Sequence, residues 1–267
     1  MTQQHKARVF SIANQKGGVG KTTTAVNLAT AVSSLKKKVL LIDLDAQGNA
    51  TVSLGLSRQG KTHNAYTVLT GQDSIQSSVV ETKIPYLYVL PSSKELLGLD
   101  IELSNIDNPQ FYLKNALNMP ELDFDYVFID CPPAVGLLTI NALVGSNAVI
   151  VPIQCEYLAL EGVADLIKTI ERVKKNFNAG LDLHGVLLTM FDSRSKLSTS
   201  VSEDVRRFFG DKVYEAFIPR NVRIPEAPSH GKPVLLYDWK CTGSQAYIRL
   251  AAEFLKREKE LLKNGQE

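Results

Sequence analysis

Two lysines and three glycines stand close together near the start of the chain, in a pattern suited to phosphate binding. The stretch reads Gln15, Lys16, Gly17, Gly18, Val19, Gly20, Lys21, Thr22 and Thr23. Glycines have no Cβ, so the backbone can curl closely around an anion. A helix that starts here would offer unpaired N–H groups to the same phosphate. Lys21 can reach the terminal phosphates of a nucleotide, and the Thr22 hydroxyl can ligate Mg²⁺.

The loop departs from the ordinary phosphate-loop pattern at one position. That pattern places a glycine six residues before its lysine, where this chain has Gln15, and the next residue is a second lysine, Lys16. Two close lysines repel each other unless several negative charges lie near them, and a nucleoside triphosphate supplies such charges. The alternative is a flexible glycine loop with a solvated lysine. The apolar run before the loop and the helical pattern after it favour the phosphate site.

Carboxylates follow two other apolar runs. Asp43 and Asp45 come after residues 39–42, and Asp130 comes after residues 126–129. Ligands of open α/β sheets bind beyond the carboxyl ends of the strands, so we expect these carboxylates near the glycine loop. Side chains two residues apart on a strand share a face, so Asp43 and Asp45 are expected on the same side. One of the two carboxylates would touch Mg²⁺ or orient water, and the other would hold the loop. Their spacing alone also fits a polar turn. An apolar strand that ends in aspartate is typical of the carboxylate that holds the water shell of Mg²⁺.

The elements that position these residues alternate between strand and helix patterns. Continuous apolar runs predict buried strands, and apolar residues at helical spacing predict helices. Strands are expected at residues 9–13, 39–42, 87–90, 126–129, 148–153 and 185–192, with a strand leading into a loop at 217–223. Helices are expected at residues 24–34, 157–177, 200–209 and 247–262, among others. Residues 1–267 are therefore predicted to form one α/β domain, a mostly parallel twisted sheet with helices on both faces.

Composition and charge narrow the kinds of partner and site. A net charge of +2 does not by itself indicate a nucleic-acid-binding protein, although a local patch can still be basic. Cys131, Cys155 and Cys241 show no paired metal-binding spacing. They fit a reducing cytoplasm better than a disulfide framework. Residues 1–8 lack the apolar core of a signal peptide, and no run approaches the ~20 apolar residues of a membrane span.

The glycine loop resembles a known variant of the phosphate loop. Residues 16–23, Lys-Gly-Gly-Val-Gly-Lys-Thr-Thr, are similar to the deviant Walker A loop of the MinD/ParA class of P-loop ATPases. Residues 43–51 resemble the ParA/Soj motif, with Ala46 where that family commonly has proline, and residues 154–162 match the same family. The resemblance implies a P-loop NTPase fold. It also implies that Lys16 reaches the nucleotide of a partner subunit and that Asp45 supports the attack of water on the γ-phosphate.

The same resemblance implies the function of a ParA/Soj-type DNA-partitioning ATPase. ATP and Mg²⁺ would bind at the loop, with Thr22 and, through water, Asp130 on the metal, and two subunits would close as a homodimer over two nucleotides. The dimer would bind double-stranded DNA without sequence choice, and a ParB-type partner would stimulate hydrolysis and release the DNA. Such a protein would be cytoplasmic and associated with the nucleoid. Family correspondence places DNA contacts at Arg194 and Arg223, and adenine contacts at Met190, Pro219, Arg220 and Asn221.

Other function classes have specific requirements that the sequence can be checked against. A MinD-type membrane-associated ATPase of cell-division positioning needs a C-terminal amphipathic helix with an apolar face. Residues 251–267 carry four large apolar side chains but also Glu253, Glu258, Glu260 and Glu267, which anionic lipid would repel. An iron–sulfur carrier needs cysteines that bridge a cluster, and an ATP-dependent ligase needs a substrate pocket that the sequence does not identify. We therefore expect no membrane partner.

Overall fold

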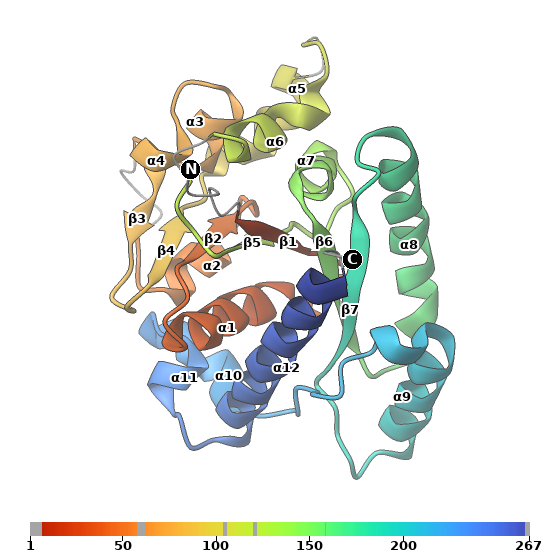
Figure 1. Cartoon of the computed structure of the whole chain (residues 1–267). Coiled ribbons are helices and arrows are strands. Elements are labelled where there is room, and N and C mark those ends of the chain that lie inside the picture. The colour runs from red at the N-terminus through yellow and green to blue at the C-terminus, as the bar shows by residue number, and fades with distance from the viewer. Residues whose placement is uncertain (1–6, 58–61, 104–105, 120–121, 158, 265–267) are drawn as a thin grey trace.

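The computed structural model describes residues 7–57, 62–103, 106–119, 122–157 and 159–264 (Figure 1). In this part of the chain seven strands form one sheet, in the order β3-β4-β2-β5-β1-β6-β7. Neighbouring strands run parallel, except for the edge pair β3 and β4. The predicted, mostly parallel sheet is therefore confirmed. The strands are β1 (Arg8–Ile12), β2 (Val39–Asp43), β3 (Val80–Glu81), β4 (Leu87–Leu90), β5 (Tyr126–Asp130), β6 (Ala148–Gln154) and β7 (Asp182–Thr189).

Helices cover both faces of the sheet, as the alternating patterns predicted (Figure 1). On one face lie α1 and α12, and on the other lie α6, α7 and α8 (Figure 1). The α-helices are α1 (Lys21–Ser34), α2 (Asn49–Ser53), α3 (Ala65–Leu69), α4 (Ile75–Ser78), α5 (Leu99–Glu102), α6 (Tyr112–Leu117), α7 (Leu137–Gly145), α8 (Ala159–Asn176), α9 (Lys196–Phe209), α10 (Arg223–Glu226), α11 (Val234–Tyr237) and α12 (Thr242–Asn264). Short 3₁₀ helices are η1 (Lys94–Gly98), η3 (Pro109–Phe111), η4 (Gly210–Lys212) and η5 (Ala227–His230).

Two apolar cores hold these layers together. Every residue of β2 and β5 is buried, because helices cover both sides of the central strands, and this explains their continuous apolar runs. Successive side chains of a strand point to opposite faces. Val127 of β5 accordingly belongs to the core under α7 and α8, whereas Phe128 packs with Leu28 of α1 and Phe254 of α12.

The parallel register brings the predicted site residues to one edge of the sheet. Asp130, the last residue of β5, is paired with Ile12 at the end of β1 and with Asp43 at the end of β2. The glycine loop and the loops after β2 and β5 therefore leave the sheet side by side. This is the edge at which parallel α/β sheets bind ligands.

The strand expected at residues 217–223 is replaced by an irregular segment. A single bridge joins Phe191 to Pro219, and α10 already begins at Arg223. Pro219 has no N–H, so it cannot extend a ladder of hydrogen bonds. The segment still follows the end of β7, because the Ile218 N–H donates to the Leu188 carbonyl at 2.9 Å.

Helix α12 closes the fold on the same face as α1. Leu250 and Phe254 of α12 are fully buried in the core that α1 shares, whereas Leu261 and Leu262 near the end of the helix are exposed. Within the described residues, no helix combines the length and the apolar character needed to cross a membrane.

Candidate active site

The glycine loop joins β1 to α1 through two residues in the left-handed backbone region. Gly18 has φ +78° and Gly20 has φ +90°, conformations that side chains with a Cβ rarely adopt. The Thr24 N–H donates to the Gly20 carbonyl at 2.9 Å, which starts α1 at the end of the loop. The loop therefore presents the first turn of α1 to a ligand at the edge of the sheet.

Two side chains from outside residues 16–23 hold the loop in place. Asn14 accepts the Lys16 N–H at 3.0 Å and donates its amide to the Pro152 carbonyl at 2.7 Å, which ties the loop to β6. Thr189, the last residue of β7, donates its hydroxyl to the Val19 carbonyl at 2.8 Å. The sequence analysis missed both tethers. An asparagine two residues before the loop is a recognisable turn signal, whereas no local pattern marks Thr189.

Lys21 is buried at the centre of the site. Its Nζ donates to the Lys16 carbonyl at 3.0 Å, and the residue is only 7% exposed. Burial lowers the pKa of Lys21, and the negative charges of Asp130 and Asp45 oppose this shift. A cation held between carboxylates and an anion-binding loop is placed to contact phosphate oxygens.

Lys16 forms an ion pair with Glu156, in the loop after β6. Both side chains are partly exposed, at 40% and 37%. Exposed ion pairs contribute only about 0–1 kcal/mol, so the ammonium can leave Glu156 for a stronger anion at little cost. The sequence assigned no role to Glu156, although it lies inside the stretch 154–162 that resembles the family.

Asp43 and Asp45, which spacing alone does not tell apart, have different surroundings. Asp43 is fully buried, and its Oδ2 accepts the Thr51 N–H at 2.8 Å and the Thr51 hydroxyl at 2.7 Å, which fixes α2. Burial raises the pKa of Asp43 to about 6, against the effect of the Thr51 hydrogen bonds. Asp45 is half-buried, and its Oδ1 accepts the Gln47 N–H at 2.9 Å. Asp45 is therefore the carboxylate with acceptor capacity to spare, and its charge acts on Lys21 of the glycine loop.

The backbone of this loop is held firmly although it has Ala46 in place of proline. The Asp45 carbonyl accepts the Gly48 N–H at 2.7 Å and the Ser92 hydroxyl at 2.5 Å. These bonds fix the position of Asp45 without a proline ring.

Asp130 has the features of an incomplete metal ligand. It is fully buried, and neither carboxylate oxygen has a partner with normal hydrogen-bond geometry among the described residues, although the Thr22 hydroxyl lies close enough to stabilise the charged form. Burial, followed by the nearby charge of Asp43, raises its pKa well above the ordinary value, while the Thr22 hydroxyl and Lys21 act in the opposite direction. A buried acceptor beside a hydroxyl fits a divalent cation. The described residues hold no group of three His, Cys, Asp or Glu able to bind a metal, so such a cation would depend on Thr22, Asp130, water and phosphate oxygens.

Replacing Asp130 by asparagine should stabilise the protein in the absence of nucleotide. The folded-state pKa lies above the unfolded value, so the ionised carboxylate destabilises the fold fully above the folded pKa; this penalty shrinks as the pH falls from the folded pKa and is gone below the unfolded pKa, near 3.8. We expect Asp130→Asn to raise the free energy of unfolding by about 1–3 kcal/mol at high pH, with a gain that shrinks toward acidic pH. Thermal melting from pH 8 to pH 4 measures this. An unchanged or lower melting temperature at pH 8 would contradict the assignment of Asp130 as an uncompensated carboxylate.

The predicted adenine residues are brought together from two parts of the chain. The Phe191 N–H donates to the Ile218 carbonyl and the Arg220 N–H to the Phe191 carbonyl, both at 3.0 Å, so residues 218–220 lie along the end of β7. Met190 has φ +51°, a strained conformation for a residue with a side chain, and such strain is concentrated at functional sites.

The side chain of Asn221 is already used within the chain. Its amide donates to the Thr242 hydroxyl at 2.8 Å, and its Oδ1 accepts the Arg223 N–H at 2.8 Å. A base at this position would therefore be read through the backbone of residues 219–221.

The two predicted DNA-binding arginines are far apart in the chain, Arg194 in the loop before α9 and Arg223 at the start of α10, and each has an acidic partner. Arg194 is 88% exposed, and its Nε and Nη2 donate to the two oxygens of Asp192 at 3.0 Å. The hydrogen bonds from Arg194 lower the pKa of Asp192 to about 2. Arg223 is 48% exposed and donates to Glu226 at 2.9 Å, with Asp238 3.6 Å from its Nε. Such exposed pairs are weak, so a phosphate can replace the carboxylates.

Known proteins resemble this chain over nearly its whole length. A family model described as an AAA domain matches residues 7–183. The chain is 51% identical to the chromosome partitioning protein ParA of Caulobacter vibrioides, over 95% of this chain and 96% of that protein. It is 46% identical to the sporulation initiation inhibitor protein Soj of Bacillus subtilis, over 92% of this chain and 97% of that protein. Among solved structures, a cobyrinic acid a,c-diamide synthase from Mycobacterium smegmatis with bound ADP and magnesium is 36% identical with a TM-score of 0.84, and the match covers 95% of this chain and 96% of that chain.

Proposed function

Because this chain belongs to the ParA/Soj family of chromosome-partitioning P-loop ATPases, we propose that it hydrolyses ATP with Mg²⁺ and that bound ATP drives a homodimer that binds double-stranded DNA. The observation that carries the proposal is the unpartnered, buried carboxylate of Asp130 near Thr22, beside a loop with two lysines. The names of the relatives at 51% and 46% identity support partitioning over the biosynthetic role named for the structure at 36% identity.

The residues around the loop divide the work of phosphoryl transfer. Lys21 and the N–H groups of the loop bind the phosphates, and Thr22 with Asp130 would hold Mg²⁺, Asp130 through water. When bound, Mg²⁺ would neutralise the negative charge that develops on the phosphate oxygens. Asp45 stands at the strand edge with a free acceptor position, where it orients the attacking water. Met190 and the backbone of residues 219–221 take the adenine.

The Lys16–Glu156 ion pair supports a role for Lys16 across a dimer. Lys21 already serves the phosphates of its own subunit, so a second lysine in the loop is free for another nucleotide. Lys16 is 40% exposed and held by a weak pair, which makes its ammonium available to the γ-phosphate of a facing subunit. Two such lysines would bridge the interface, so that dimerisation requires ATP.

The DNA-binding step is assigned to Arg194 and Arg223. Both are exposed, and both can exchange a carboxylate for a DNA phosphate. A ParB-type partner that stimulates hydrolysis would release the DNA and complete the cycle. The protein would then act on the nucleoid in the cytoplasm. The alternative of a membrane-associated ATPase is less well supported, because Leu250 and Phe254 of α12 are buried in the core.

The test of this function is a DNA-binding titration with the double variant Arg194→Ala/Arg223→Ala. We expect wild type to bind a random duplex more tightly with ATP than without it, and the double variant to lose this binding for all sequences while still dimerising. Each lost phosphate contact should lower the log–log salt slope by about 0.9. Binding at several salt concentrations, with light scattering on the same samples, gives both quantities.

Arg207→Ala is the matched control, because Arg207 is also an exposed arginine paired with a nearby acid, Asp204. It should keep wild-type affinity and slope. Loss of binding in the control alone would move the DNA surface to α9. A wild-type protein that binds DNA equally with and without ATP would refute the proposed function.

A further inference from the structure

The segment that begins with Arg223 is seated on the elements that leave the nucleotide site. Residues 223–238, here called the arginine segment, comprise α10, η5 and α11. Of these, α11 contacts α1, and η5 contacts α2. Because α1 starts at the glycine loop and α2 follows the Asp45 loop, both supports of the arginine segment start at the proposed ATP site (Figure 1).

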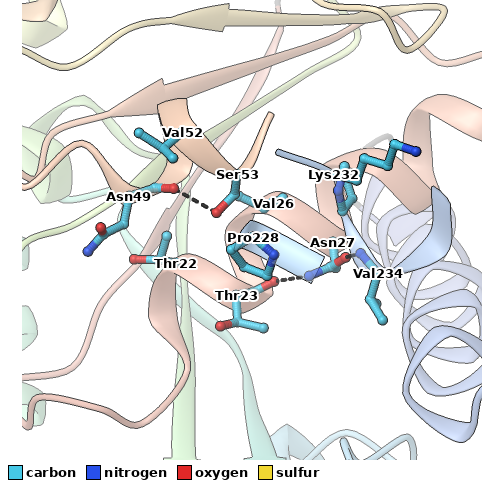
Figure 2. Close-up of a pocket in the computed structure, with 11 residues that line it drawn as sticks. Thr22, Thr23, Val26, Asn27, Asn49, Val52, Ser53, Pro228, Lys232 and Val234 are labelled. Atoms are coloured by element: carbon cyan, nitrogen blue, oxygen red, sulfur yellow. Dashed lines mark hydrogen bonds between the residues drawn. The ribbon is translucent and has the colours of Figure 1, made fainter. Parts of the chain in front are cut away.

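The first support is a bridge through the side chain of Asn27. Its amide donates to the Thr23 carbonyl in the first turn of α1 at 2.8 Å, and its Oδ1 accepts the Val234 N–H at 2.8 Å (Figure 2). Asn27 is only 4% exposed, and both of its hydrogen bonds are to backbone groups of the protein. A buried polar group left without a partner is costly, and Val234 must therefore follow Asn27 when the first turn of α1 moves.

The second support is a contact between two glycine backbones. A Cβ on Gly55, just after α2, would lie 2.9 Å from the Gly231 carbonyl oxygen, and a Cβ on Gly231 would lie 2.9 Å from the Gly55 Cα. Both glycines have positive φ, at +77° and +60°. An open pocket of about 270 Å³ is lined by α1, α2 and residues 228–234, and Asn27 and Val234 are among its lining residues (Figure 2).

The position of Arg223 depends on how this segment is seated. Its two acidic partners, Glu226 and Asp238, belong to the same segment. The Ser244 hydroxyl of α12 lies 3.0 and 2.7 Å from the Val234 and Asp238 carbonyls, so the first residue of α11 and the residue that follows this helix are linked through one side chain. A displacement of Val234 would therefore be carried to the acids that hold Arg223.

We propose that Asn27 is a positioning residue that couples the nucleotide-bound first turn of α1 to the arginine segment. It touches neither nucleotide nor DNA and acts through Thr23 on one side and Val234 on the other. The inference rests on the proposed function for the identity of both ligands. It predicts that ATP changes the dynamics of residues 223–238 only while the Asn27 bridge is intact.

The experiment compares Asn27→Ala with Asn141→Ala. Asn141 has a comparable arrangement on α7: its amide donates to the Leu137 carbonyl one turn earlier and also to the Pro109 carbonyl, and its Oδ1 accepts the N–H of a distant residue, Leu113. Because Asn141 makes one more hydrogen bond than Asn27, Asn141→Ala should lose at least as much stability as Asn27→Ala. Hydrogen exchange over residues 223–238 is measured with and without Mg²⁺ and a non-hydrolysable ATP analogue, and nucleotide affinity is measured separately.

We expect the analogue to slow exchange of the segment in wild type and in Asn141→Ala. In Asn27→Ala this slowing should fall about tenfold, within the usual range of coupling between sites, while nucleotide affinity stays within about threefold of wild type, a difference below the smallest coupling expected. Slowing that persists in Asn27→Ala, or that falls equally in both variants, would overturn the inference. The inference would also be overturned if hydrogen exchange of residues 223–238 in wild type were the same with and without the nucleotide analogue.

A second pair of variants tests the same coupling if Asn27→Ala folds poorly. Gly231→Ala should break the contact with Gly55 and also uncouple the segment. Gly71→Ala is its control, because Gly71 has φ +72° but open space around it. The readout also separates the two proposals: slowed exchange without ATP-dependent DNA binding would leave the coupling in place and refute the DNA-binding function.

Discussion

Lys21→Ala should lose nucleotide binding almost completely, with affinity at least about 100-fold weaker than wild type. Lys21 is the buried ammonium of the site, held by the Lys16 carbonyl and surrounded by the charge of Asp130 and Asp45. Hydrogen bonds to charged groups contribute about 1.5–3 kcal/mol each, and 1.4 kcal/mol corresponds to a tenfold change in affinity. Equilibrium binding of a fluorescent ATP analogue with Mg²⁺ measures the loss.

Lys16→Ala is the control for this result, because it removes a lysine of the same loop that is exposed and paired with Glu156. It should bind nucleotide nearly as wild type does. Circular dichroism of both variants excludes unfolding, which matters because Lys21 partly offsets the buried carboxylate of Asp130. ATP affinity that stays normal in Lys21→Ala would mean that the phosphates bind elsewhere.

Most of the site could be predicted from the sequence, because the ligand-binding residues of a parallel sheet lie at the carboxyl ends of its strands. The run that ends in Asp130 and the run that precedes Asp43 are both buried strands, and their register places the two aspartates next to each other. A local pattern was enough here, since a strand buried on both faces must be continuously apolar and its polar residues can follow only where it ends. The irregular path of residues 217–223 shows the limit of such patterns, because Pro219 breaks a run that otherwise resembles a strand.

The contacts that support the site could not be predicted in the same way, because each joins distant parts of the chain. Lys16 and Glu156 are 140 residues apart, Val19 and Thr189 are 170 apart, and Asn27 and Val234 are 207 apart. No periodicity links such positions. These contacts form because the folded chain places the end of β6, the end of β7 and the arginine segment beside the glycine loop and α1.

Asp43 and Asp45 show the same limit at short range. Period two placed them on one side, the family resemblance pointed to Asp45, and their hydrogen bonds supply the structural difference between them. Asp43 is committed to Thr51 and therefore to the position of α2, whereas Asp45 keeps one oxygen for a ligand. The catalytic role is for this reason proposed for Asp45 alone.

Asp45→Ala should bind ATP but hydrolyse it at least about 100-fold more slowly, since a positioned base contributes about 10²–10⁴-fold to a reaction. If hydrolysis normally ends the dimeric state, the variant should accumulate as a dimer in ATP. Phosphate release measures the turnover, and size-exclusion chromatography with light scattering measures the dimer.

Asp45→Asn is the sharper comparison, because asparagine can still accept the Gln47 N–H that Asp45 accepts at 2.9 Å, but carries no charge. If the carboxylate itself acts on water, both variants should be equally slow, and both should form the ATP-dependent dimer. If only the loop geometry matters, Asp45→Asn should keep most of the turnover. A monomer in ATP, or undiminished hydrolysis in Asp45→Ala, would remove Asp45 from the catalytic role and leave the orientation of water to another group of the site.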